Sequence, residues 1–148
     1  MTTFQLESVD VWAKESRELM YAHWQELGLD LDLELDPDIQ KMKAMEDLGM
    51  WKVITAREDG RMVGYMLMIF GPHLHYRSSP PMSFIDAYYV SPDCRRGTGA
   101  KLILFMEGIA RRLGAIKIYL SCKVHKDHMP LFTALGYRLS DFACTKRI

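Results

Sequence analysis

Hydrophobic side chains in the first part of the chain recur at helical spacing. Between residues 8 and 27 they lie three to four positions apart, which predicts one amphipathic helix that Gly28 ends. The following segment, 29–36, alternates leucine with acidic residues, a pattern that fits either a short strand or an exposed loop. The apolar face of the predicted helix carries Trp12, Leu19, Met20, Trp24 and Leu27.

A second, shorter helix is predicted to begin at Asp36-Pro37 and to run to about Leu48. An aspartate can cap the first turn through its carboxylate, and proline suits the first helical position because no N–H is needed there. Gly49 follows the last apolar residue and is the kind of residue at which helices end.

Short runs of β-branched, aromatic and other apolar residues in the middle of the chain predict strands. Asp59-Gly60 between two of these runs is a hairpin signal. A helix joins the strands on either side of residue 100, so those two strands should be parallel. The predicted strands are 4–6, 51–56, 62–70, 82–90, 116–120 and one or two within 137–148, and the predicted later helices are about 99–113 and 131–135.

Composition narrows the class of protein. A chain of 148 residues that is 49% hydrophobic and 26% charged fits a single domain with a sizeable core. Its 19 basic and 19 acidic residues cancel, which argues against nucleic acid as the main partner. No apolar run could cross a membrane, and the first residues lack a signal-peptide pattern. Cys94, Cys122 and Cys144 are scattered without metal-ligand spacing, so we expect reduced thiols, no metal and a cytoplasmic location.

The segment 88–100 carries the clearest chemical signal. An apolar strand runs into a turn that holds Arg95, Arg96, Gly97 and Gly99, and an amphipathic helix follows at once. Such a junction directs several backbone N–H groups and the positive end of the helix dipole at one place, which suits a phosphate group. The turn lacks the endings of a nucleotide P-loop and of a dinucleotide fold. The simpler alternative is an ordinary strand–turn–helix link with two turn glycines.

This turn resembles the acetyl-coenzyme A signature of GNAT-family N-acetyltransferases, Arg/Gln-x-x-Gly-x-Gly/Ala at the head of a helix. Two registers are open. In the register that we favour, Gly97 and Gly99 take the glycine positions, Leu102 and Ile103 fall on the family's leucine pair, and Cys94 replaces the usual Arg or Gln. This register also places the helix face correctly.

In the other register Arg95 is the first residue of the motif, and Thr98 and Ala100 replace the two small positions. Backbone groups do most of the phosphate binding, so both registers leave a workable site. The late turn 134–137 also resembles the family's Leu-Gly-Phe/Tyr turn, and the order of elements is similar to the whole fold. The resemblance therefore implies an α/β protein with a GNAT-like mixed sheet flanked by helices.

The resemblance further implies acetyl-coenzyme A as cosubstrate. In the family the strand before the turn offers backbone groups to the pantetheine arm and the thioester, and the next parallel strand splays away to leave a slot. Ser121 and Cys122 would lie at the mouth of that slot. The cofactor-binding residues implied in this way are Tyr88, Tyr89, Val90, Cys94, Arg95, Arg96, Gly97, Thr98, Gly99, Ala100, Ser121 and Phe132.

Acetyl transfer to an amine needs a proton acceptor, because an alkylamine with a pKa of about 10 is protonated at neutral pH. Asp86 precedes the proposed pantetheine contacts on the same strand and is our first candidate for the base. An aspartate that is paired with a neighbouring cation or that caps a bulge is the structural alternative. His73 and His75 lie in the loop before this strand, and His75 is a further catalytic candidate beside the alternative of a surface histidine.

The residue at the position of the family's general acid differs from the family's pattern. Many members place a tyrosine near the thiolate leaving group, and alignment on the late turn puts Phe132 there, which cannot donate a proton. Either the thiolate leaves unassisted, since a thiol pKa of about 8.5 makes it a fair leaving group, or another side chain helps. Tyr119 is the candidate that we favour, and Tyr137, His125 and His128 are the others.

The acceptor cannot be read from a motif, and small-molecule and protein amines both remain open. An acidic link could attract a cationic acceptor such as a polyamine, aminoglycoside or lysine, although a solvated loop is the simpler interpretation. Two alternatives remain: a non-catalytic acyl-coenzyme A-binding module, and a GNAT-like enzyme acting on a protein or nucleic-acid partner. A homodimer is compatible with the family resemblance. The acidic residues of the link are Asp30, Asp32, Glu34, Asp36 and Asp38.

Overall fold

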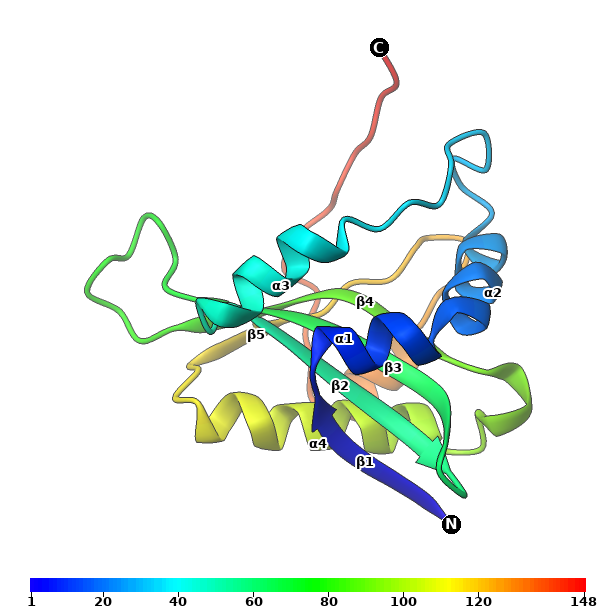
Figure 1. The fold of residues 1–148 in the computed structure, drawn as a ribbon. Coiled ribbons are helices and arrows are strands. Elements are labelled where there is room, and N and C mark those ends of the chain that lie inside the picture. The colour runs from blue at the N-terminus through cyan, green and yellow to red at the C-terminus, as the bar shows by residue number, and fades with distance from the viewer.

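A computed structural model describes residues 1–148 as a five-stranded sheet with helices on both faces (Figure 1). The strands lie in the order β1-β2-β3-β4-β5; neighbours are antiparallel except β4 and β5, which are parallel as expected. The strands are β1 Thr2–Glu7, β2 Trp51–Glu58, β3 Arg61–Gly71, β4 Met82–Val90 and β5 Lys117–Tyr119. The helices are α1 Val9–Glu15, α2 Arg17–Leu27, α3 Ile39–Asp47, α4 Thr98–Arg112 and α5 Met129–Ala134, with a 3-10 turn at Pro92–Cys94.

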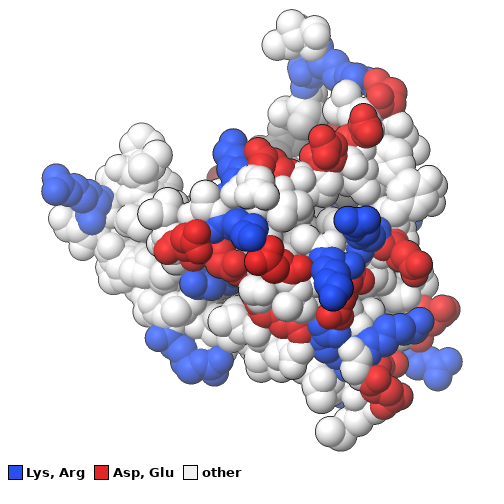
Figure 2. Space-filling model, in the orientation of Figure 1, with Lys and Arg blue, Asp and Glu red and all other residues white.

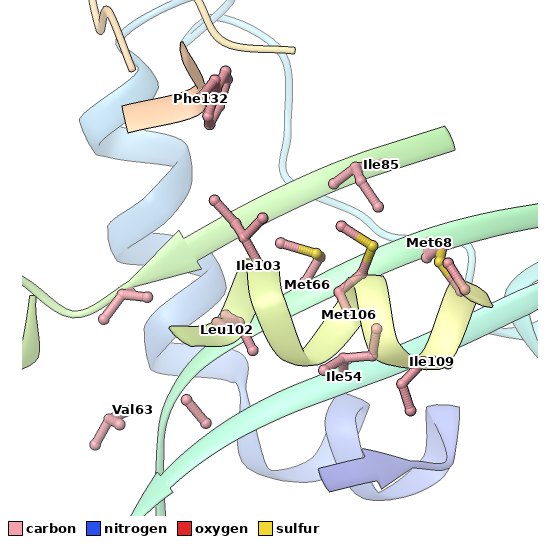
Figure 3. Packing of buried hydrophobic residues seen from close by; sticks show 13 residues of the cluster. Ile54, Val63, Met66, Met68, Ile85, Leu102, Ile103, Met106, Ile109 and Phe132 are labelled. Atoms are coloured by element: carbon pink, nitrogen blue, oxygen red, sulfur yellow. The ribbon is translucent and has the colours of Figure 1, made fainter. Parts of the chain in front are cut away.

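Two apolar layers hold the sheet between its helices. On one face, α4 packs Leu102, Ile103 and Met106 against strand residues such as Met66 and Ile54 (Figure 3). On the other face, α1 to α3 cover β2 and β3 through a second cluster around Trp12, Trp51 and Tyr65. The second cluster ends at Tyr89 of β4 and includes no residue of β5, so this end of the sheet is the less covered one.

The hairpin predicted at Asp59-Gly60 is confirmed. Asp59 has φ 49° and Gly60 has φ 84°, the two left-handed residues that a two-residue hairpin turn requires. Glu58 pairs directly with Arg61 on the two sides of the turn.

The single helix predicted over residues 8–27 is instead two helices, because Ser16 leaves the helical conformation with ψ near 3°. The Ser16 N–H still bonds to the Trp12 carbonyl at 2.8 Å, and the Ser16 carbonyl accepts from Met20 at 2.7 Å. The helix axis therefore changes direction at Ser16, while the apolar face continues from one helix to the next. For this reason the hydrophobic periodicity did not reveal the break.

The helix predicted to start at Asp36-Pro37 begins two residues later. Asp38 is the N-cap of α3, and its carboxylate accepts the Lys41 N–H at 2.9 Å. The segment 29–36 before it is a loop, one of the two outcomes that its alternation allowed.

The strands predicted within 137–148 are wrong. This segment contains no strand, and after Tyr137 all its residues are exposed. Its neighbour β5 is only three residues long, so an added strand would gain few ladder hydrogen bonds. The contact that holds its end is an ion pair from Arg147 to Asp32 in the α2–α3 loop, at 2.8 Å.

Candidate active site

The site lies where β4 and β5 separate. Their pairing is limited to residues 82–84 and 117–119, and the last matched pair is Phe84 with Tyr119. Beyond that pair, the chain after β5 leaves the sheet, and exposed Ser121 and half-buried Cys122 follow in the departing loop. The second half of β4 consequently keeps one unpaired edge of backbone N–H and C=O groups, as expected for a slot between the strands.

A β-bulge at Asp86 turns the rest of β4. Ala87 lies opposite Leu67 while Ile85 lies opposite Met68, so Asp86 is the extra residue between two ladder pairs. The alternation of side chains shifts by one at this point. Tyr88 and Val90 therefore pack on the α4 side, and Tyr89 packs with the cluster under α1 to α3.

The first turn of α4 is open to an anion. Gly97 is its N-cap, with φ 80°, and no side chain caps the helix or places an acidic group in the first turn. The N–H groups at this end are therefore left for an external acceptor beside the positive end of the dipole. Buried Thr98 anchors the turn, and exposed Arg96 stands beside it. These features fit the phosphates of coenzyme A.

Gly99 makes the close approach at this turn. A Cβ added there would overlap the hydroxyl oxygen of Tyr88, which comes up from β4. Burial raises the pKa of Tyr88 to about 12, so the hydroxyl stays neutral. A side chain on Gly99 would therefore displace Tyr88. Half-buried Cys94 and Ala100 complete the turn, and the Cys94 thiol points to Glu58 at 3.6 Å.

Arg95 does not extend freely toward a ligand at this turn. Its guanidinium forms an ion pair with Glu26 of α2 at 2.5 Å, and its Nε donates to the Val90 carbonyl at 2.9 Å. The same group lies 5.6 Å from the centre of the Tyr89 ring. Arg95 thus connects the turn, the end of β4 and helix α2.

The sequence alone did not single out His23 and Tyr65, which lie beneath this junction. The His23 ring stacks on Tyr89 with centroids 4.8 Å apart, and its Nδ1 lies 2.8 Å from the Tyr65 hydroxyl. Burial lowers the pKa of His23 to about 4, so the ring is neutral at pH 7. Spacing offered one signal: His23 and Glu26 are three residues apart and share a helix face.

Asp86, the candidate base, is exposed to solvent on the α1–α3 side of the sheet. Partial burial among the surrounding strands nevertheless raises the pKa of its carboxyl above the ordinary value. Its charge is felt by Tyr65, whose pKa is raised mainly by burial and also by Tyr89 and Asp86. Asp86 forms no ion pair, but it is the extra residue of a β-bulge, which is the other position that the structural alternative named.

The other two catalytic candidates, His75 and Tyr119, and the predicted cofactor-binding residue Phe132 lie in two groups. His75 is exposed in the β3–β4 loop, where its N–H donates to His73 Nδ1 at 3.2 Å. Tyr119 stacks on Phe84 with ring centroids 4.6 Å apart. On the α4 side, Phe132 is 1% exposed and lies in the core, with the His128 ring stacked on it at 6.1 Å.

The remaining candidates for a proton donor are engaged elsewhere. The Tyr137 hydroxyl donates to Glu107 of α4 at 2.9 Å, and burial together with that carboxylate raises its pKa. His125 Nε2 lies 2.5 Å from the Leu27 carbonyl. These contacts tie the late turn to α4 and the loop after β5 to α2.

Two global features bear on the class of protein. None of the helices is long and apolar enough to cross a membrane, and no group of His, Cys, Asp and Glu side chains is arranged to hold a metal ion. Acidic and basic side chains alternate over the face seen in Figure 2 rather than gathering in one field of a single sign.

Solved structures with the same fold are numerous. A GCN5-related N-acetyltransferase from Ralstonia eutropha has a TM-score of 0.78 at 20% identity, covering 100% of this chain and 99% of that one. An aminoglycoside acetyltransferase from an uncultured soil metagenomic sample has a TM-score of 0.77 at 17% identity, covering 100% and 99%.

A ribosomal-protein-alanine N-acetyltransferase from Brucella melitensis biovar Abortus has a TM-score of 0.73 at 20% identity, covering 99% of each chain. A search of the curated proteins finds no match. The Acetyltransferase (GNAT) family matches residues 10–137, which include the open β4 edge and the glycine turn. The chain therefore belongs to the GNAT acetyltransferase family, whose members are acyltransferase enzymes.

Proposed function

We propose that this protein transfers an acetyl group from acetyl-coenzyme A to a primary amine by direct attack of the amine on the thioester. The observation that carries the proposal is the uncapped first turn of α4 beside the unpaired edge of β4. The first turn of α4 can bind the phosphates of the cosubstrate. The unpaired edge of β4 offers backbone hydrogen bonds to its extended pantetheine arm. Family membership supports acetyl-coenzyme A as the donor.

In this proposal Asp86 receives the proton that the amine loses. The neutral nitrogen then attacks the thioester carbonyl, the carbon–sulfur bond breaks, and the sulfur leaves with the electron pair. A thiol pKa of about 8.5 lets the thiolate depart without an obligatory donor. The nitrogen loses its second excess proton as the amide forms, and the thiolate takes up that proton through water. The raised pKa of Asp86 supports this role, because a base works best when its pKa approaches the working pH.

Tyr119 and His75 are secondary catalytic candidates. The Tyr119 ring lies against Phe84, two residues before Asp86, and His75 lies in the neighbouring loop. Neither makes a hydrogen bond to Asp86. We therefore give Asp86 the first test.

The first experiment is calorimetric titration of the purified chain with acetyl-coenzyme A, coenzyme A and ATP. We expect tight binding of the two coenzyme A species and weak binding of ATP. Gly99→Glu should abolish this binding through overlap with Tyr88 and charge repulsion. Gly108→Glu is the matched control, because a Cβ there makes only an ordinary contact, 3.7 Å from Arg112.

Wild-type affinity in a folded Gly99→Glu protein would remove the proposed phosphate site. A non-catalytic binding module is the alternative function, favoured by the phenyl ring of Phe132, which has no proton to donate at the family's tyrosine position. Binding of acetyl-coenzyme A without transfer to any amine of a broad panel would establish that alternative.

A further inference from the structure

A cluster of aromatic side chains stands on the sheet near Asp86. Phe84 of β4 and Tyr119 of β5 are half-buried and stacked, with ring planes 4° apart. The β3–β4 loop adds His73, whose ring centroid lies 6.5 Å from Phe84, and Tyr76, 5.0 Å from His73 (green loop, Figure 1). We call Phe84, Tyr119, His73 and Tyr76 the aromatic platform.

The platform turns ring edges toward solvent. Phe84 and Tyr119 face each other across the parallel ladder, and their centroid separation of 4.6 Å is close to the strand spacing of about 4.8 Å. The two rings therefore stand upright on the sheet with their faces against each other. The Lys117 ammonium lies over the Tyr119 ring, 4.3 Å from its centroid, on the side away from Phe84.

The platform and Asp86 share one face of the sheet. Phe84 lies opposite Ile69, which packs against the cluster under α1 to α3. The bulged Asp86 lies at most roughly 7 Å further along the strand, and its charge acts on Tyr65 of the same cluster. Helices α1 to α3 pack over β2 and β3 and leave this part exposed. The loop beside it carries only one charged residue, Arg77, and the corresponding surface at the left of Figure 2 is mostly uncharged.

Electrostatic complementarity determines which class of ligand the aromatic platform favours. Aromatic ring edges are positive and prefer the negative face of another ring, whereas an ammonium prefers a ring face. The platform offers edges to a ligand, and the exposed face of Tyr119 already holds Lys117. A polycation without an aromatic ring would therefore gain little binding free energy on the aromatic platform. An amine separated from an aromatic ring by two or three carbons could place the ring on the platform and the nitrogen at Asp86.

We propose that the aromatic platform selects arylalkylamines as acetyl acceptors. The inference rests on the proposed acetyl transfer and names the acceptor class of that same site. Phe84 and Tyr119 act in it as specificity residues, through contact with the acceptor's ring.

The test compares amines that differ only in the ring. Release of free coenzyme A from acetyl-coenzyme A is followed with 2-phenylethylamine, 2-cyclohexylethylamine and spermidine, using the full chain. We expect kcat/KM for 2-phenylethylamine to exceed that for the cyclohexyl analogue about fivefold, since an edge-to-face contact adds about that much beyond area burial. Spermidine should be the poorest of the three.

Phe84→Leu should reduce this ratio to about one, mainly through KM. Tyr119→Leu should reduce the ratio independently; any catalytic role of the Tyr119 hydroxyl affects both amines alike and cancels in the ratio. Tyr119→Phe should restore the ratio, because the ring and not the hydroxyl makes the contact. Phe142→Leu is the matched control: this ring is 88% exposed and lies outside the platform, so the ratio should persist.

Equal kcat/KM for the phenyl and cyclohexyl amines in the wild type would overturn the inference and leave acetyl transfer standing. An unchanged ratio in both leucine variants would overturn it as well. Absence of transfer to every amine, with acetyl-coenzyme A bound, would instead mark failure of the proposed function itself.

Discussion

At the scale of the residue, Asp86 joins a backbone irregularity to a chemical property. The bulge makes it the unpaired residue of β4, and partial burial raises the pKa of its carboxyl. A carboxylate without an ion-pair partner is free to accept a proton from an incoming amine.

Asp86→Asn should lower kcat about 100-fold at pH 7 while leaving acetyl-coenzyme A affinity unchanged. In the wild type the rate should rise as pH passes upward through the Asp86 pKa, because only the carboxylate accepts the proton. The variant should lose that part of the pH profile. Asp59→Asn in the exposed hairpin is the control. A wild-type rate and pH profile in Asp86→Asn would exclude Asp86 as the base.

His23 makes a second prediction at this scale, on stability. Its folded pKa of about 4 lies below the unfolded value of 6.5, so the unfolded chain binds the proton first as pH falls. The contribution of neutral His23 to the free energy of unfolding is complete above pH 6.5 and is lost as the pH falls toward 4. Urea unfolding should show a loss on the order of 2 kcal/mol across this range, after allowance for partial exposure.

His23→Asn should be less stable at pH 7 but should show a smaller decline between pH 6.5 and 4 than the wild type. Parallel declines in the two proteins would mean that other groups dominate acid unfolding.

At the scale of the element, the contact between β3 and β4 is unusually close. A Cβ on Gly64 would lie 2.9 Å from the Tyr89 carbonyl oxygen and 3.0 Å from the Val90 side chain. Gly64 therefore lets the end of β4 settle against β3, immediately before the turn that leads to α4.

Gly64→Ala should destabilise the protein by about 1–3 kcal/mol, because backbone rather than a flexible side chain must move. It should also weaken coenzyme A binding, since the end of β4 positions the turn. Gly71→Ala on the same strand is the control; its Cβ would meet only the flexible end of Met50 at 3.8 Å. Equal stability of the two variants in denaturant titrations would contradict this account.

At the scale of the whole molecule, Arg57 joins elements far apart in sequence. Its guanidinium contacts Glu7 of β1 at 2.7 Å, Glu15 of α1 at 2.7 Å and the Gly60 carbonyl of the hairpin at 2.7 Å. The Arg57 and Glu7 side chains are only 11% and 8% exposed. Burial alone would raise the Glu7 pKa, but Arg57 outweighs it and holds the pKa below its ordinary value.

Arg57→Ala should cost about 3 kcal/mol of stability, because it leaves the Glu7 carboxylate buried without its partner. Lys43→Ala is the control, since the pair of Lys43 with Asp10 is exposed and contributes little to stability. A similar small loss in both variants, measured by thermal unfolding, would show that Arg57 acts only as a surface charge.

The strands of the central sheet, the hairpin, the parallel crossover and the glycine turn at the head of α4 could all be predicted from the amino-acid sequence. Each of these depends on local information: residues adjacent in the chain, with a periodicity or a turn chemistry of their own. The sequence analysis missed the break at Ser16, because a single residue that leaves the helix does not alter the apolar pattern. It placed the start of α3 two residues early, because Asp36 and Asp38 are both suitable N-caps and the helix uses Asp38. The absence of strands after Tyr137 depends on how little of β5 is available for pairing.

The surroundings of the candidate site, by contrast, depend on contacts between residues that are distant in the sequence. The bulge at Asp86 depends on the register against β3, and the link from Arg95 to Glu26 joins positions 69 residues apart. The burial of His23 and the stack of Phe84 on Tyr119 likewise arise from contacts across strands and layers. No local pattern encodes such contacts, because pKa values and ring geometry depend on which distant side chains exclude water from a group.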